Sequence, residues 1–123
     1  MRQSILVVDD YGPFAATLRL LLAADYDVEI VGSAADGLER IARRSFDVVL
    51  CDLKLPDMDG EAFFAAVRAH DPLLSDRMVF MTGGGLGGSL ARFQAAQRGR
   101  VLTKPFEVNA LRAALKAARG TGA

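Results

Sequence analysis

The sequence predicts a single α/β domain whose core is a parallel β-sheet with helices on both faces. Short runs rich in Val, Ile and Leu alternate with stretches of helical periodicity along the chain, as is typical of βαβ units. The run 47–52 is apolar throughout its middle, which favours a strand covered on both faces. The chain has 123 residues, 51% of them hydrophobic, which fits one core. We therefore expect one domain over residues 1–123, with its core at about 4–118 and a frayed tail at 119–123.

The first half of the chain contains three expected strands and two expected helices. The strands are β-branched or apolar runs, at 5–8, 28–31 and 47–52. The first helix, at about 13–24, places Phe14, Leu18, Leu21 and Leu22 at i, i+4, i+7 and i+8. The second helix, at 35–43, turns Leu38 and Ile41 inward.

The second half continues the alternation to five strands and five helices. Its strands are expected at 78–82 and 101–103, and its helices at 60–69, 89–97 and 107–118. Pro72 is expected to break the chain after the third helix. A glycine-rich loop, 83–88, follows the fourth strand, and its composition predicts a mobile loop that becomes ordered when phosphate or a partner binds.

Composition excludes several classes of function. Fifteen basic and fifteen acidic residues give a net charge of zero, which argues against nucleic acid as the main partner. No apolar run approaches the ~20 residues needed to span a bilayer, and no secretory segment opens the chain. The single cysteine, Cys51, excludes an internal disulfide and a CxxC-type zinc site, and suits a reducing cytoplasm, where we expect the protein to act.

Polar residues stand where the expected strands end. In chain order they are Asp9, Asp10, Asp52, Thr82 and Lys104. The reactive site of an open α/β sheet lies at the carboxyl ends of its strands, so these side chains should gather at one edge. Three carboxylates that close together repel one another, and Mg²⁺, which prefers oxygen ligands, would neutralise them.

This residue set suits phosphoryl transfer. A carboxylate can attack phosphorus to form an aspartyl phosphate, and Asp52 is the expected nucleophile because it ends the central strand. Lys104 supplies positive charge, and Thr82 supplies a hydroxyl donor for the phosphoryl oxygens. Taken singly, each residue also has an ordinary structural interpretation, such as a turn or helix-cap acid or a surface lysine. Their ordered occurrence at strand ends favours the site.

Four segments resemble the receiver (response-regulator) family, across about 4–118. They read ILVVDD, DVVLCDLKLPDMDG, VFMTGG and VLTKPF. The resemblance implies a flavodoxin-like, CheY-like fold with strand order 2-1-3-4-5. It also implies phosphorylation at Asp52, magnesium ligation by Asp10, by Asp9 through water and by the backbone carbonyl of Lys54, and roles for Thr82 and Lys104 at the phosphoryl group. The Lys104–Pro105 peptide bond would be cis.

By the same resemblance the protein is a signalling switch rather than an enzyme. It would accept its phosphoryl group from a sensor histidine kinase or a histidine phosphotransfer protein, and pass the signal to a protein target or a kinase linked in a longer parent chain. The sequence departs from the family at Val101, where receivers often carry Tyr or Phe, so the usual coupling through that ring cannot operate.

Two alternatives stay open from the sequence. A degenerate receiver would act as an unphosphorylated protein-interaction module, which Val101 favours. The segment 83–88 also matches the dinucleotide fingerprint G-x-G-x-x-G, although only one strand follows it and no strand-end acid is placed to bind a ribose. A P-loop is excluded because no Gly-Lys-Ser/Thr is present, and an EF-hand is excluded by register.

Overall fold

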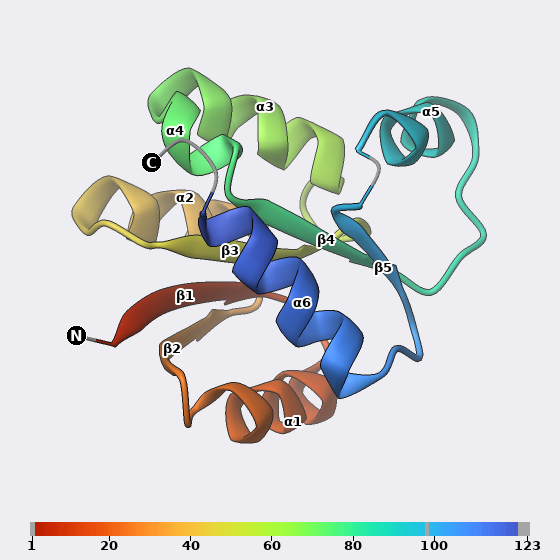
Figure 1. Cartoon of the computed structure of the whole chain (residues 1–123). Coiled ribbons are helices and arrows are strands. Elements are labelled where there is room, and N and C mark those ends of the chain that lie inside the picture. Colours follow the sequence, from red (N-terminus) through yellow and green to blue (C-terminus); the bar gives the residue numbers. More distant parts are fainter. Residues whose placement is uncertain (1, 98, 121–123) are drawn as a thin grey trace.

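The computed structural model describes residues 2–97 and 99–120, which form a five-stranded parallel sheet between two helical layers (Figure 1). The strands lie in the order β2-β1-β3-β4-β5, which confirms the predicted fold class. They are β1 (Gln3–Val8), β2 (Tyr26–Val31), β3 (Val48–Asp52), β4 (Met78–Thr82) and β5 (Val101–Thr103). The helices are α1 (Gly12–Leu22), α2 (Ala34–Arg43), α3 (Gly60–His70), α4 (Pro72–Ser75), α5 (Gly88–Ala96) and α6 (Val108–Arg119).

Each face of the sheet has its own apolar core. On one face, α1 and α6 pack against side chains that include Ile5, Leu50 and Met81. On the other face, residues of α2, α3 and α5 pack against side chains that include Leu6 and Phe80. The three central strands are therefore buried on both faces, as their continuous apolar sequences predict.

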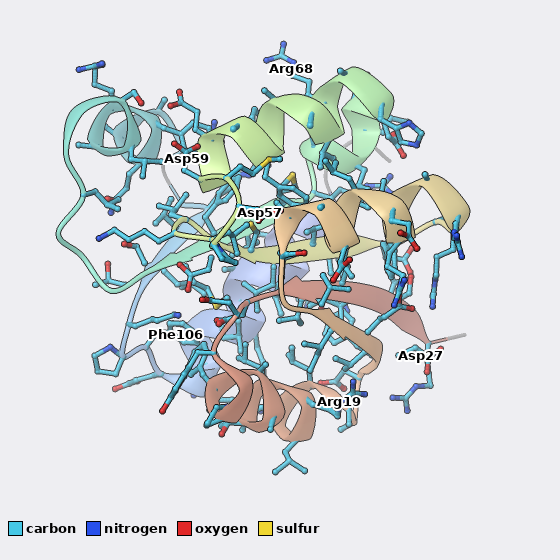
Figure 2. The ribbon with its side chains drawn as sticks, turned by 180° about the vertical axis from the view of Figure 1, so that it is seen from behind. Arg19, Asp27, Asp57, Asp59, Arg68 and Phe106 are labelled. Carbon is cyan, nitrogen blue, oxygen red and sulfur yellow. The ribbon has the colours of Figure 1, made fainter. Side chains whose placement is uncertain are left out.

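Two carboxylates fix the starts of helices beside the third strand. The Asp59 side chain accepts a hydrogen bond of 2.8 Å from Ala62 N and caps α3. Asp57 lies in the same loop and accepts hydrogen bonds of 2.9 and 2.8 Å from the amides of Ala34 and Ala35, at the start of α2 (Figure 2). The loop after β3 is thereby tied to both neighbouring helices.

The third helix ends at His70, just before Pro72, as expected, but Pro72 also opens the one-turn helix α4, which was not predicted. A proline is tolerated at a first helical position, where its missing N–H has no partner within the helix. Asp71 caps this turn by accepting from Leu74 N at 3.2 Å. The described chain thus has six helices in place of the expected five.

The expected tail at 119–123 was also placed slightly early. Arg119 is the last residue of α6 and donates a hydrogen bond of 3.0 Å to the Tyr26 hydroxyl. Residues 121–123 lie outside the described part of the chain. None of the helices in that part is both long enough and apolar enough to cross a membrane.

Candidate phosphoryl-acceptor site

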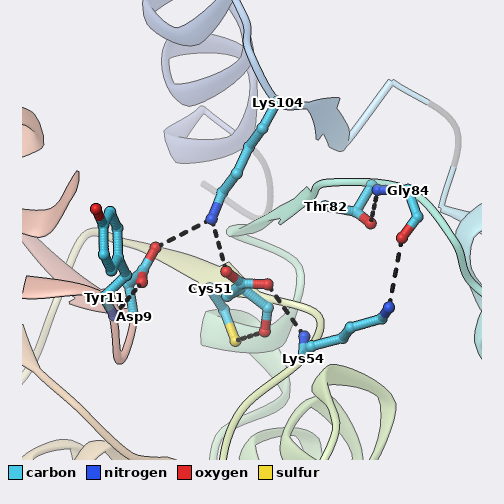
Figure 3. A network of polar contacts seen from close by, with 8 residues as sticks. Asp9, Tyr11, Cys51, Lys54, Thr82, Gly84 and Lys104 are labelled. Atoms are coloured by element: carbon cyan, nitrogen blue, oxygen red, sulfur yellow. Dashed lines mark hydrogen bonds and ion pairs between the residues drawn. The ribbon is translucent and has the colours of Figure 1, made fainter.

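The candidate residues lie at the carboxyl edge of the sheet because of its parallel register. Val8 of β1 pairs with Cys51 of β3, so Asp9 and Asp52 follow at the same level. Thr82 ends β4 beside Thr103 of β5. Lys104 follows Thr103 directly and therefore reaches the same edge, as Figure 3 shows.

Lys104 joins the two buried carboxylates. Its Nζ lies 2.7 Å from Asp52 Oδ2 and 3.3 Å from Asp9 Oδ2 (Figure 3). The Asp9 side chain is fully buried and that of Asp52 is 13% exposed, whereas that of Lys104 is 23% exposed. The ammonium thus neutralises part of a buried negative charge and leaves the group open to solvent on one side.

The remaining oxygens of the two carboxylates accept backbone hydrogen bonds. Asp9 Oδ1 accepts from Tyr11 N at 2.8 Å, and Asp52 Oδ1 accepts from Lys54 N at 3.0 Å. These contacts fix the orientation of both groups. Each oxygen has a second lone pair, so these bonds leave capacity for further ligands.

Thr82 and the glycine-rich loop form the wall on the β4 side. The buried Thr82 Oγ1 accepts a hydrogen bond of 3.0 Å from Gly84 N and retains its own proton as a donor. The Lys54 side chain reaches over to the loop, where its Nζ lies 3.4 Å from the carbonyl oxygens of Gly84 and Gly85. Those two glycines have positive φ values of 93° and 69°, which explains why glycine occupies them.

The charge on Lys104 is stabilised by its surroundings. Burial opposes the charged form, but the hydrogen bond and the negative charge of Asp52, with the charge of Asp9, raise the pKa of Lys104 overall. Its Nζ also lies 4.4 Å from the centroid of the Phe14 ring, a cation–π distance. The sequence assigned Phe14 only to the core, because helical spacing does not reveal which ring faces a lysine 90 residues later.

Cys51 takes no visible part in this chemistry. The thiol is fully buried next to Asp52, and burial, followed by the charges of Asp52 and Asp9, raises its pKa well above the ordinary value. The side chain is therefore a neutral core group at neutral pH.

Two buried carboxylates at this edge, those of Asp9 and Asp52, are available to a magnesium ion. Asp10 is exposed, and within residues 2–97 and 99–120 no three His, Cys, Asp or Glu side chains form a group that could hold a metal ion. Mg²⁺ commonly keeps several waters and takes one or two carboxylates. Asp9 and Asp52 bring two negative charges against the single ammonium of Lys104, so their oxygens fit such an ion.

A family model for the response regulator receiver domain matches residues 5–116. The chain belongs to this family. It is therefore a response regulator receiver domain of two-component signalling, and receiver domains generally act as signalling switches. The regulatory protein LuxO of Vibrio cholerae is 36% identical to it over 107 residues, which are 86% of this chain and 23% of LuxO. The receiver domain thus spans less than a quarter of that relative.

Solved receiver domains share the fold. The receiver domain of the sensor histidine kinase PA1611 from Pseudomonas aeruginosa is 25% identical, with a TM-score of 0.83 over 98% of this chain and 100% of that one. That structure has a magnesium ion coordinated in its active-site cleft. A CheY-like receiver domain from Methanospirillum hungatei is 26% identical, with a TM-score of 0.85 over 98% of this chain and 95% of that one.

Two further features anticipated from the resemblance are present in the fold. The Lys104–Pro105 peptide bond is cis. Val101 pairs with Phe80 in the sheet and packs against the buried core cluster to which Phe80 and Phe93 belong. The position that often carries an aromatic ring in receivers is thus a partly buried aliphatic one in this domain.

Proposed function

We propose that this receiver domain accepts a phosphoryl group on Asp52 from a sensor histidine kinase or a histidine phosphotransfer protein. The observation that carries the proposal is the contact of Lys104 Nζ with both Asp52 and Asp9, since three different strands contribute to it. An ordinary surface lysine would not be held between two buried carboxylates. A carboxylate nucleophile beside a fixed positive charge suits phosphoryl transfer to Asp52.

In the proposed reaction, a carboxylate oxygen of Asp52 attacks phosphorus. The bond from phosphorus to the donor's histidine nitrogen breaks as the new oxygen–phosphorus bond forms. Lys104 offsets the charge on the phosphoryl oxygens, and the Thr82 hydroxyl donates a hydrogen bond to one of them. Asp52 is held for attack by its bond from Lys54 N, which orients the carboxylate without using all of its lone pairs.

We further propose that Mg²⁺ is bound by Asp9, Asp10, Asp52 and the backbone carbonyl of Lys54, with Asp9 acting through water. When bound, the ion would supply the positive charge that lets carboxylate and phosphoryl oxygens approach one another. The support is the negative charge concentrated at the buried Asp9 and Asp52. The magnesium reported for the PA1611 receiver domain is consistent with this assignment.

The remaining assignments extend the same proposal. Residues 1–123 would form one receiver domain, whose partner is the phosphohistidine-bearing protein and whose output is a protein contact or a kinase linked in a longer chain. We propose a switch that assists its own phosphorylation and dephosphorylation, acting in the cytoplasm. We propose no direct contact of the domain with nucleic acid or with a membrane.

Phosphorylation can be tested without the natural kinase. The wild-type domain is incubated with acetyl phosphate and Mg²⁺, and covalent phosphate is measured by intact-mass spectrometry. We expect one phosphoryl group on the wild type and none on Asp52→Asn, with Asp57→Asn as a matched control that is still modified. An unmodified wild-type protein would overturn the proposal and favour an unphosphorylated interaction module.

Magnesium binding has a separate readout. We expect Mg²⁺ to shift the backbone amide resonances of Asp9, Asp10, Asp52 and Lys54 in NMR spectra, in the absence of any phosphate donor. Asp9→Asn should weaken this binding because it removes a buried charge. Equal affinity of the wild type and Asp9→Asn would contradict the assignment of Asp9.

A further inference from the structure

A second polar cavity lies at the edge of the sheet where β1 and β2 begin, away from Asp52. It has a volume of about 510 Å³ and is lined by Gln3, Asp25, Tyr26, Arg112, Lys116 and Arg119. Gln3 and Tyr26 are the first residues of β1 and β2 and pair with each other in the sheet. The three cations all belong to α6, which lies across the sheet in Figure 1. The volume is within the range of small-molecule sites.

The cations line one face of α6. Arg112, Lys116 and Arg119 are spaced i, i+4 and i+7, so their side chains leave the helix in the same direction. Arg112 and Lys116 are exposed. Against three positive charges the lining has one carboxylate, that of Asp25, so the formal charge of the lining side chains is positive. Arginine offers planar donors that match phosphate, and lysine adds a compact charge.

Arg119 is held in place within the cavity. Its guanidinium donates to the Tyr26 hydroxyl at 3.0 Å and lies 5.5 Å from the centroid of the Tyr26 ring. The Tyr26 hydroxyl accepts this bond and keeps its own proton for another acceptor. Burial, opposed by the charge of Arg119 and its hydrogen bond, raises the pKa of Tyr26, so the phenol stays protonated at neutral pH.

The other polar groups favour a ligand that carries hydroxyl groups as well as phosphate. The Asp25 carboxylate accepts hydrogen bonds, and the Gln3 amide both donates and accepts them. A hydroxylated ligand supplies matching partners for both. An acidic protein segment suits the site less well, because the lining is concave.

We propose that this cavity binds a small phosphorylated polyol, such as a sugar phosphate or a nucleotide. Arg112, Lys116 and Arg119 bind the phosphate, while Asp25 and Gln3 bind hydroxyl groups of the sugar. The site is independent of phosphorylation at Asp52. It lies at the opposite end of the strands from Lys104, which contacts Asp52 in the candidate phosphoryl-acceptor site.

The test is an NMR titration of the full ¹⁵N-labelled chain with ribose 5-phosphate, AMP, inorganic phosphate and ribose as separate probes. We expect ribose 5-phosphate or AMP to shift the amide resonances of Gln3, Asp25 and Tyr26 in a saturable way. Inorganic phosphate should bind at least about tenfold more weakly, because it lacks the hydroxyl contacts. Ribose should leave these resonances unchanged.

Charge variants separate the cavity from general attraction of anions. The double variant Arg112→Gln/Lys116→Gln should weaken binding at least about tenfold. Arg68→Gln, which removes an exposed cation on the outer side of α3 (Figure 2), should not change it. Circular dichroism of each variant shows whether it is folded, and a Lys116→Gln single variant replaces the double variant if that one unfolds.

Several outcomes would overturn the proposal. One is that neither ribose 5-phosphate nor AMP shifts the cavity resonances at about 10 mM, a concentration that detects even millimolar affinity. Others are that the shifts cluster only around Lys104, that the charge variant binds as well as the wild type, or that inorganic phosphate binds as tightly as the sugar phosphates.

Discussion

Replacement of Lys104 by Met should destabilise the domain through the loss of one ammonium between two carboxylates. Methionine keeps an unbranched apolar stem beside Phe14 but cannot donate to Asp52 or Asp9. The Asp9 side chain is fully buried and would keep only its bond from Tyr11 N. The variant therefore leaves a buried negative charge poorly compensated, which is the costly case for an ion pair.

The size of the effect follows from exposure and distance. A hydrogen bond to a charged group contributes about 1.5–3 kcal/mol. The bond of 2.7 Å to Asp52 is short, whereas the 3.3 Å contact with Asp9 is longer. The Lys104 side chain is 23% exposed, so solvent screens part of the interaction. We expect a loss of about 2 kcal/mol in the free energy of unfolding, or roughly 1 M in the urea midpoint.

The measurement is urea unfolding without Mg²⁺ at several pH values. Because the folded-state pKa of Lys104 is raised above 10.5, its stabilisation is complete below that pH and is lost as pH rises through the folded-state pKa. The gap between wild type and variant should therefore be constant around neutral pH and narrow only above about pH 10.5. Lys116→Met, at an exposed position on α6, is the matched control. A loss no larger than that of the control would refute the reasoning.

Four further predictions concern the packing, hydrogen bonding and exposure of individual residues. Gly60→Ala should lower the free energy of unfolding by about 1–3 kcal/mol, because the new Cβ would lie 2.9 Å from Leu53 Cα. Gly12→Ala is the control and should leave the free energy of unfolding unchanged, because its Cβ would have no neighbour within 4 Å. Equal urea midpoints of the two variants would contradict this prediction. Asp57→Asn should lower stability at neutral pH. Hydrogen bonds from the amides of Ala34 and Ala35 lower the pKa of Asp57, so this carboxylate stabilises the fold fully above its ordinary pKa of 3.8. The difference in urea midpoint between wild type and Asp57→Asn should therefore vanish as pH falls through the folded-state pKa. Cys51 should resist thiol reagents in the native domain and react after unfolding; rapid native labelling would disprove its burial. Backbone amides of residues 83–88 should gain hydrogen-exchange protection when a phosphoryl mimic is added. Without the mimic, Lys54→Met should reduce their protection, because it removes the contacts of Lys54 with the carbonyls of Gly84 and Gly85. Identical exchange rates in all of these samples would contradict both expectations.

The strand pattern could be predicted from sequence because the central strands are buried on both faces. The limits of β4 and β5 agree with those expected, and β3 differs by one residue. The second strand was expected to begin at residue 28, but it begins at Tyr26, since Asp27 is exposed on an edge strand and interrupts the apolar run. The one-turn helix α4 was missed because four residues are too few to show helical periodicity.

The candidate site could be anticipated only in part. The rule that parallel strands end at one edge predicted that Asp9, Asp10, Asp52, Thr82 and Lys104 lie at the same edge. In the fold Lys104 joins Asp9 and Asp52, whereas Asp10 is exposed. The rule could not say which groups would touch, because contacts such as that between Lys104 and Phe14 depend on the path of α1 over the sheet. The α6 cavity was not predicted, because its lining combines three segments that are distant in the sequence. Its cations, all on α6, look like ordinary solvated side chains in the sequence.

Aromatic rings attach α5 to the sheet beside Val101 of β5. Phe93 of α5 lies edge-on to Phe80 with ring centroids 5.1 Å apart, and tilted to Phe64 at 5.4 Å. Val101 pairs with Phe80 and packs against the buried core that contains Phe80 and Phe93. The aromatic contact here is therefore made by a ring from the helix instead of a ring from β5. Because Phe93 is buried, a displacement of α5 must repack Phe80, which lies two residues before Thr82 on β4.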